Sequence, residues 1–152
     1  MKNLLRWIID TFQNRGLPGV LVCLFKKDQN AELELLLVRS TTSPHFFHFP
    51  SGFINPLEDP LNAALRELEE ETSIALDSLI TTPYKHSFTY PMVPFHPRSV
   101  QRLYVSEVSP GTSSKPDHEI IESRWCSITE AKKLVYPELN IIIDQALLSI
   151  AK

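Results

Sequence analysis

Four glutamates stand close together in the segment ALRELEEETSI, residues 64–74. On a helix, Glu67, Glu70 and Glu71 share one face, because residues three and four positions apart are neighbours there. Carboxylates this close repel one another unless a cation lies between them, and hard oxygen donors suit Mg²⁺ or Mn²⁺. The spacing therefore indicates a divalent metal site. The alternative is a solvated surface helix, since glutamate is a strong helix former.

A carboxylate-bound Mg²⁺ can bridge phosphate oxygens, offset charge as a bond breaks and lower the pKa of a bound water. This is the equipment for hydrolysing a phosphoanhydride bond. The sequence contains no G-x-S-x-G motif for a serine nucleophile, and its four glycines exclude a Walker A loop and a G-x-G-x-x-G motif. If the glutamates hold a cation, metal-assisted hydrolysis by water is the chemistry that they would serve.

The elements around the glutamates would have to position them. Asp59 and Pro60 predict the start of a helix that reaches about Thr72, because aspartate caps free amides and proline suits the first helical position. One stripe of this helix would press against a sheet and direct the acidic face to the edge of that sheet. The stripe consists of Leu61, Ala64, Leu65, Leu68 and Thr72.

The remaining pattern is a mixture of strands and helices. Residues 19–25 and 32–38 predict a hairpin, and the later segments 80–90, 99–108 and 120–127 read as strands. A helical pattern begins at Thr129 and runs toward the C-terminus, while residues 41–44, 91–97 and 109–116 read as loops. This order does not alternate as βαβ units do. It favours an α+β fold in which helices pack on the faces of a curved mixed sheet.

The composition is typical of one globular domain. The 152 residues fit the usual domain size, and 43% apolar residues can build a core. The formal charge of −3 provides no overall positive field, so a long nucleic-acid duplex is not an expected partner. Cys23 and Cys126 lie in strand-like apolar segments, which predicts reduced, buried thiols.

The N-terminal segment MKNLLRWIIDTF predicts a short amphipathic helix. Arg6 and Asp10 interrupt its apolar run and no small-residue cleavage site follows, which argues against an export signal. Residues 16–25, the most apolar uncharged run, supply about half of the roughly 20 residues that a membrane-spanning helix needs. We therefore expect a cytoplasmic protein that does not bind membranes.

The segment around the glutamates resembles the signature of the Nudix hydrolase family. That signature is a glycine, five residues, a glutamate, seven residues, and then R-E-U-x-E-E-x-G-U, in which U is a bulky aliphatic residue. Eight of its nine specified positions match: Gly52, Glu58, Arg66, Glu67, Leu68, Glu70, Glu71 and Ile74. Ser73 stands where the family usually has glycine. If that position needs a positive φ, a serine there costs on the order of 1 kcal/mol.

The resemblance implies a single α/β/α sandwich over residues 1–152, with residues 1–15 as a helical extension. It also implies a metal site for Mg²⁺ or Mn²⁺ and a set of catalytic residues. The metal site would consist of Glu67, Glu70, Glu71 and Gly52, and the catalytic set of Glu67, Glu70, Arg66 and Glu119. Arg66 would orient glutamates by charge-assisted hydrogen bonds, with an ordinary i, i+4 ion pair as its alternative. Glu58 would support the loop or bind metal through water, with helix capping as its alternative.

Four residues outside the signature are candidates for substrate binding. Arg39 follows the second predicted strand and could meet phosphate, and His48 and Phe49 lie just before the signature, where a base could stack. Tyr90 ends a segment rich in aromatic and positive groups, YKHSFTY. Packing in the core is the alternative for each aromatic residue. Glu119 precedes Trp125 by six residues, and glutamates at a similar place serve the metal or the water in several Nudix enzymes. Glu122 is a rival for this role, and a solvated loop glutamate is the alternative for both.

The resemblance implies a small nucleotide as substrate, and we expect a nucleoside triphosphate or a related nucleotide polyphosphate. A dinucleoside polyphosphate is an alternative, and so is the 5′ end of RNA, because FPSGFINP resembles that branch of the family. A hypothesis of another class is a non-catalytic nucleotide-binding module. The N-terminal segment would either pack on the domain or mediate a homodimer.

Overall fold

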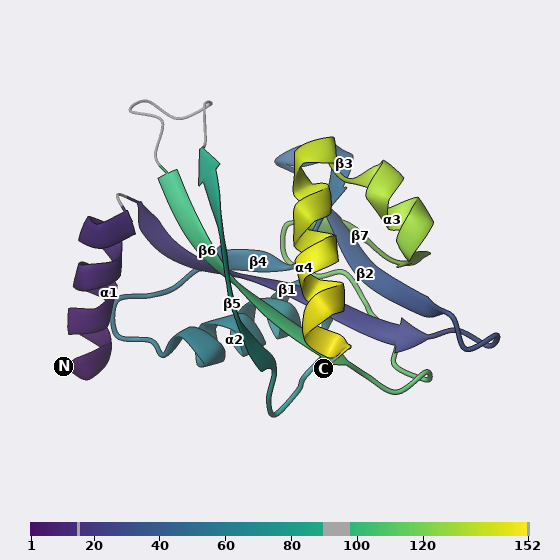
Figure 1. The fold of residues 1–152 in the computed structure, drawn as a ribbon, viewed down its shortest axis with the longest axis horizontal. Coiled ribbons are helices and arrows are strands. Elements are labelled where there is room, and N and C mark those ends of the chain that lie inside the picture. The colour runs from purple at the N-terminus through teal and green to yellow at the C-terminus, as the bar shows by residue number, and fades with distance from the viewer. Residues whose placement is uncertain (15, 90–97, 152) are drawn as a thin grey trace.

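The computed structural model describes residues 1–14, 16–89 and 98–151, in which helices cover both faces of a mixed β-sheet (Figure 1). The elements before the helix that carries the glutamates are α1 (Lys2–Asn14), β1 (Leu17–Lys27), β2 (Leu33–Ser40), β3 (Ser43–His48) and β4 (Ser51–Phe53). The glutamates belong to α2 (Pro60–Thr72). The elements after it are β5 (Ile80–Thr89), β6 (Arg98–Glu107), β7 (Ile120–Ser127), α3 (Ile128–Leu134), η1 (Pro137–Leu139) and α4 (Asn140–Ile150).

In the described part of the chain, seven strands form one sheet with the main order β3-β2-β1-β6-β5. β1 and β2 form the predicted antiparallel hairpin, and β1 runs parallel to β6 on its other side. The short β4 pairs with β1, and β7 pairs with β2 over most of its length. The sheet is therefore mixed and lies between helices, as the order of elements in the sequence predicts.

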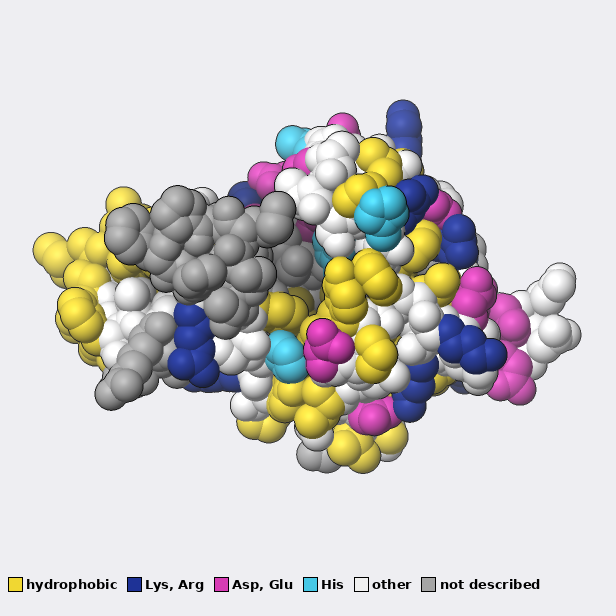
Figure 2. All heavy atoms as spheres, turned by 90° about the horizontal axis from the view of Figure 1, so that it is seen from above, with side chains coloured by type: hydrophobic (Ala, Val, Ile, Leu, Met, Phe, Trp, Pro, Cys, Tyr) yellow, Lys and Arg dark blue, Asp and Glu magenta, His cyan; other side chains and the backbone are white. Residues whose placement is uncertain are grey.

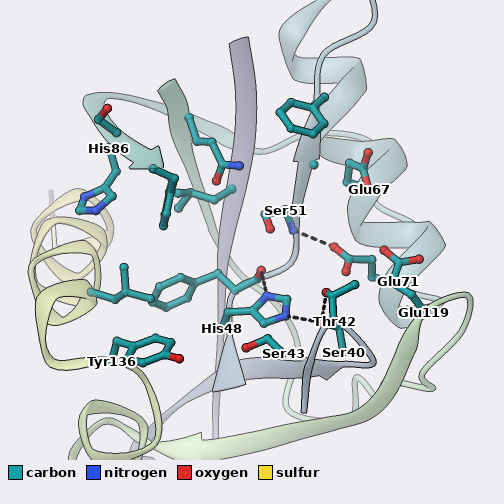
Figure 3. A pocket seen from close by; sticks show the side chains of 18 of the residues that line it. Ser40, Thr42, Ser43, His48, Ser51, Glu67, Glu71, His86, Glu119 and Tyr136 are labelled. Atoms are coloured by element: carbon teal, nitrogen blue, oxygen red, sulfur yellow. Dashed lines mark hydrogen bonds between the residues drawn. The ribbon is translucent and has the colours of Figure 1, made fainter. Parts of the chain in front are cut away.

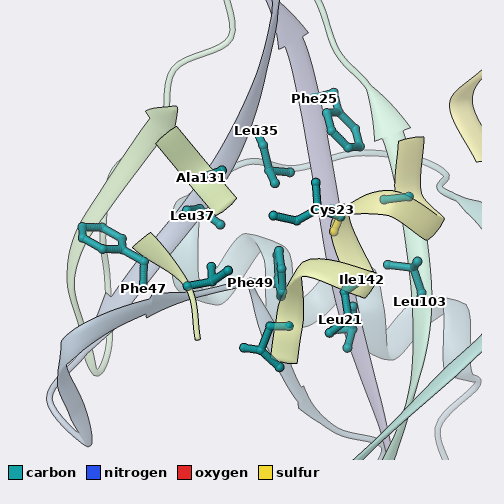
Figure 4. Close-up of a cluster of buried hydrophobic side chains, with 14 of the residues drawn as sticks. Leu21, Cys23, Phe25, Leu35, Leu37, Phe47, Phe49, Leu103, Ala131 and Ile142 are labelled. Atoms are coloured by element: carbon teal, nitrogen blue, oxygen red, sulfur yellow. The ribbon is translucent and has the colours of Figure 1, made fainter. Parts of the chain in front are cut away.

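β1 is buried on both faces, and its alternating side chains divide the core into two clusters. Leu21, Cys23 and Phe25 pack beneath α3 and α4 in the first cluster (Figure 4). Val20 and Val22 point to the other face and pack with α2 in the second cluster. Because successive side chains of a strand point to opposite faces, one strand serves both cores. Cys23 and Cys126 are free, buried thiols, as predicted.

α2 begins and packs as its sequence predicts. Asp59 is its N-cap, and one carboxylate oxygen of this residue accepts the amide hydrogen of Leu61 at 3.0 Å. Ala64, Leu68 and Thr72 are fully buried, and the partly buried Leu61 and Leu65 pack against the second cluster. The helix also buries Ala63 and Glu71. Its apolar stripe therefore fixes α2 on the sheet.

Three segments differ from their predicted structure. β4 overlaps the start of the signature and was not predicted, because three residues are too few for a recognisable alternation, and β3 begins inside the predicted loop 41–44. The C-terminal helical pattern is not continuous. It divides into α3, η1 and α4 because Pro137 cannot donate an amide hydrogen to a helix that crosses it. The predicted loop 91–97 lies outside the described residues.

α1 packs on the domain rather than standing free. The indole of Trp7 donates to the carbonyl of Ile54 at 2.9 Å, and Asp10 accepts from Arg102 at 2.8 Å. The opposite face leaves Leu5 and Phe12 exposed, and apolar side chains gather at this end of the molecule (Figure 2). Within the residues that the structure describes, no helix has the length and apolar character to cross a membrane.

Ser73 ends α2 in a left-handed conformation, with φ 62° and ψ 18°. Its amide donates to the carbonyl of Glu69 at 2.9 Å, which is the usual closure of a helix. The position therefore has the backbone for which glycine is best suited, and the serine carries a conformational cost there.

We expect the Ser73→Gly variant to be more stable than Ser73→Ala by about 1 kcal/mol. Both variants lose the hydroxyl group, so the difference between them isolates the cost of a side chain in the left-handed region. Urea denaturation under identical conditions measures both free energies of unfolding. Equal stabilities would show that the backbone at this position carries no such cost.

Candidate active site

One large pocket brings together residues from the sheet, α2 and the C-terminal region. Its volume is about 770 Å³, within the usual range of roughly 300–1,000 Å³ for small-molecule sites. Figure 3 shows Glu67, Glu71 and Glu119 on one side of this pocket, and His86 and Tyr136 on the opposite side. One side is thus acidic and the other is aromatic.

Arg66 binds most of the signature glutamates. Its guanidinium forms a bidentate pair with Glu58, at 2.7 and 2.8 Å, and donates to Glu67 at 2.9 Å and to Glu70 at 3.3 Å. It also donates to the carbonyl of Phe53 in β4 at 3.2 Å. The guanidinium hydrogen bond lowers the pKa of Glu58. The i, i+4 pair with Glu70 is therefore one contact within a wider network that joins the loop before α2 to the helix.

Gly52 allows the carboxylate of Glu67 to lie against β4. A Cβ atom at Gly52 would come within 2.1 Å of both Cδ and Oε1 of Glu67. Only a residue without a side chain permits this approach. Burial raises the pKa of Glu67, and the positive charge of Arg66 opposes that rise.

Glu71 is the most buried of the signature glutamates. Its Oε1 accepts the amide hydrogen of Ser51 at 2.8 Å, and the residue is 3% exposed. Burial raises the pKa of Glu71 to about 8, and the negative charges of Glu67 and Glu119 add to the effect. Glu71 therefore carries a charge at high pH that its surroundings only partly compensate.

Of the three glutamates predicted to bind metal, Glu67 and Glu71 line the pocket whereas Glu70 does not, and the three do not converge as expected. Among the described residues, no group of three or more His, Cys, Asp and Glu side chains is arranged to hold a metal ion. The reason lies in their hydrogen bonds. Arg66 attracts Glu67 and Glu70, whereas the amide of Ser51 holds Glu71. Gly52 lines the pocket beside them.

Glu119 reaches the pocket from the loop between β6 and β7. Its side chain lines the cavity with Glu67 and Glu71, although it lies far from them in the sequence. Its backbone carbonyl accepts from the amide of Thr41 at 3.0 Å. The fold thus adds a carboxylate from a loop to those of the helix.

His48 and Phe49 line the same pocket. His48 contacts the carbonyl of Phe49 through Nδ1 at 3.0 Å, which makes Nδ1 the donor, and Nε2 lies 3.4 Å from the hydroxyl of Ser40. Burial lowers the pKa of His48. Phe49 is 3% exposed and belongs to the first core cluster, so it forms both core and pocket wall.

Arg39 does not line the pocket. It donates to Glu122 at 2.9 Å and to the carbonyl of Pro44 at 2.8 Å, and its guanidinium lies near the ring of Phe47. The next residue, Ser40, lines the pocket, and neighbouring side chains of a strand point to opposite faces. Tyr90, the remaining candidate, lies outside the described residues.

The aromatic side of the pocket contains residues that the sequence pattern did not single out as a site. Tyr136 stacks on Phe46 with ring centroids 3.9 Å apart, and it precedes η1. His86 and Phe88 project from β5 and contribute the adjacent wall. The aromatic content of residues 84–90 was the only sequence signal that indicated this wall. Nothing in the sequence around Tyr136 indicates that a break before α4 brings it to the pocket that the glutamates line.

The arrangement defines a class of site. Oxygen donors suited to a divalent cation face rings suited to a planar ligand, across a cavity large enough for a nucleotide. A model of the family described as NUDIX domain matches residues 16–145, which include the sheet and α2. The chain belongs to the Nudix hydrolase family.

Relatives and solved structures agree with this assignment. The asymmetrical bis(5′-nucleosyl)-tetraphosphatase of Caenorhabditis elegans is 26% identical over 113 residues, covering 74% of this chain and 81% of that protein. The protein of the same name from Mus musculus is 28% identical over 124 residues, covering 80% and 84% respectively. The crystal structure of a C. elegans Ap4A hydrolase binary complex has a TM-score of 0.73 at 21% identity, covering 89% of this chain and 98% of that one. This structural likeness shows the shared fold.

The raised pKa of Glu71 predicts a pH-dependent stability. Because its pKa in the folded chain, about 8, lies above the ordinary value of 4.5, the protonated group contributes stability below that ordinary value and loses it as the pH rises through about 8. In the presence of a chelator, we expect the free energy of unfolding of the wild type to fall relative to Glu71→Gln between about pH 5 and about pH 9. Urea denaturation across this range checks the difference, and parallel profiles would contradict it.

Proposed function

We propose that this protein hydrolyses a phosphoanhydride bond of a nucleotide polyphosphate and that dinucleoside polyphosphates are its preferred substrates. The observation that carries the proposal is the pocket, in which carboxylates and aromatic rings face each other (Figure 3). Phosphates with their cation suit the first side, and a base suits the second. The two relatives named as bis(5′-nucleosyl)-tetraphosphatases support the choice of substrate class.

A divalent cation, Mg²⁺ or Mn²⁺, belongs to this proposal. The donor chemistry fits, because Glu67 and Glu71 place hard oxygen donors in the pocket, and a bound cation would offset the burial and mutual repulsion that raise their pKa values. Glu70 completes the set on the same helix. When bound, the cation would neutralise phosphate charge and lower the pKa of a water molecule.

The protein residues have separate tasks in this proposal. Arg66 orients Glu67 and Glu70 and connects them to Glu58 in the preceding loop. Glu119 serves the metal or the attacking water from the loop between β6 and β7. His48 and Phe49, which line the same pocket, contact the substrate.

Substrate preference is tested with a panel of compounds in the presence of Mg²⁺. We expect kcat/KM for a dinucleoside tetraphosphate to exceed that for the matching nucleoside triphosphate by at least about 10-fold, since a second nucleoside adds contacts. Chromatography identifies the products, which should be a mononucleotide and a nucleoside triphosphate. Preference for RNA 5′ ends would overturn the substrate class. Tight nucleotide binding without hydrolysis would indicate a non-catalytic module instead.

Variants that remove one carboxylate charge test whether the protein is an enzyme. Glu67→Gln and Glu70→Gln should each lower kcat by at least roughly 100-fold, because each removes a charge from the proposed metal site. Glu69→Gln is the matched control, since this residue stands on the same helix with an exposed side chain. Circular dichroism verifies that all variants fold. Unchanged turnover in the two site variants would refute the assignment.

A further inference from the structure

The loop between β6 and β7 is fastened to the C-terminal end of α2. The amide of Lys115 donates to the carbonyl of Thr72 at 2.8 Å, and the hydroxyl of Ser73 donates to the carbonyl of Lys115 at 3.1 Å. Nδ1 of His118 donates to the carbonyl of Glu70 at 3.0 Å, because a carbonyl oxygen can only accept. These hydrogen bonds join two segments that are about forty residues apart in the sequence.

The contacts satisfy groups that a helix end leaves without partners. The last four carbonyls of an α-helix have no partner within the helix. The amide of Ser73 binds the carbonyl of Glu69, and the loop supplies donors for Glu70 and Thr72. The loop therefore caps the helix from outside, and the helix end determines where the loop lies.

Glu119 immediately follows this fastened segment. Its own carbonyl is held by the amide of Thr41, and its side chain lines the same side of the pocket as Glu67 and Glu71. Like charges repel, so a loose loop would carry Glu119 away from the helix. The hydrogen bonds on either side of Glu119 oppose that movement.

We propose that Ser73 and His118 are positioning residues that hold Glu119 at its working distance from the carboxylates of α2. This inference rests on the proposed function, in which Glu119 serves the metal or the water. Ser73 departs from the glycine of the Nudix signature, and its hydroxyl provides a contact with the loop that glycine lacks. His118 likewise has a positive φ of 55° while its ring reaches the helix. At both positions the residue has a left-handed backbone conformation that is unfavourable for a side chain. In each case the side chain makes a contact between α2 and the loop.

The decisive variant is Ser73→Gly, which removes the hydroxyl and relieves the backbone. We expect kcat on the preferred polyphosphate to fall by about 10-fold with KM nearly unchanged, because a small displacement of a catalytic group slows the reaction. The free energy of unfolding should stay near that of the wild type, so the loss cannot be attributed to unfolding. Ser109→Ala is the matched control. It removes a hydroxyl contact, that between Ser109 and Thr112, at the far end of the same loop and should leave kcat unchanged.

His118→Asn tests the second contact, since asparagine tolerates a left-handed backbone but lacks the imidazole. Its kcat should fall by a similar factor. A double-mutant cycle then identifies the group through which both residues act. In a Glu119→Gln background, Ser73→Gly and His118→Asn should lower kcat no further, because the carboxylate that they position is absent.

The outcomes separate this inference from the proposed function. An inactive wild type would overturn both. An active wild type whose kcat is unchanged in Ser73→Gly and His118→Asn would overturn the positioning role alone. Equal losses in the Glu119→Gln background would also overturn it, because the two residues would then act through another group.

Discussion

The site depends on how one positive charge is shared among closely spaced negative ones. Arg66 neutralises Glu58 and Glu67 through short hydrogen bonds and Glu70 through a longer one. Burial raises the pKa of Glu71 to about 8, and the backbone amide of Ser51, which acts in the opposite sense, does not cancel this effect. Glu71, on the buried side of the cluster, therefore keeps its proton up to about pH 8. A cation bound beside it would take the place of that proton.

The fold makes this arrangement stable by distributing its core over two faces of the sheet. β1 contributes alternate side chains to each face, so α2 can be anchored without competing with α3 and α4 for the same apolar surface. The short β4 then presents Ser51 and Gly52 to α2. The carboxylates are positioned by an apolar stripe on one side and by main-chain groups of β4 on the other.

Local signals explain what could be predicted from the sequence. The Asp59 cap, the apolar stripe of α2 and the alternating strands depend on neighbours within one element, so their positions follow from spacing. The position of the Arg39 side chain does not follow from spacing, because its orientation depends on which face of β2 contains the pocket. Tyr136 reaches the pocket only because Pro137 divides the last helical region, and that placement results from tertiary packing.

The contacts of the glutamates also depend on tertiary structure. Their common helix face follows from the sequence, but the competition between Arg66 and the amide of Ser51 follows from where β4 lies. The hydroxyl contact of Ser73 is a further example, since the substitution is visible in the sequence whereas its partner in a distant loop is not. Spacing therefore predicted which glutamates share a helix face, and packing determined their contacts.

Gly52 provides space rather than an interaction. The atoms that a methyl group would meet there belong to the free end of the Glu67 side chain, which can rotate away, so the backbone could tolerate the change. Thermodynamic stability and reactivity are consequently separable at this position. A survey of variants selected only for folding would regard residue 52 as permissive, whereas selection for turnover would allow glycine alone.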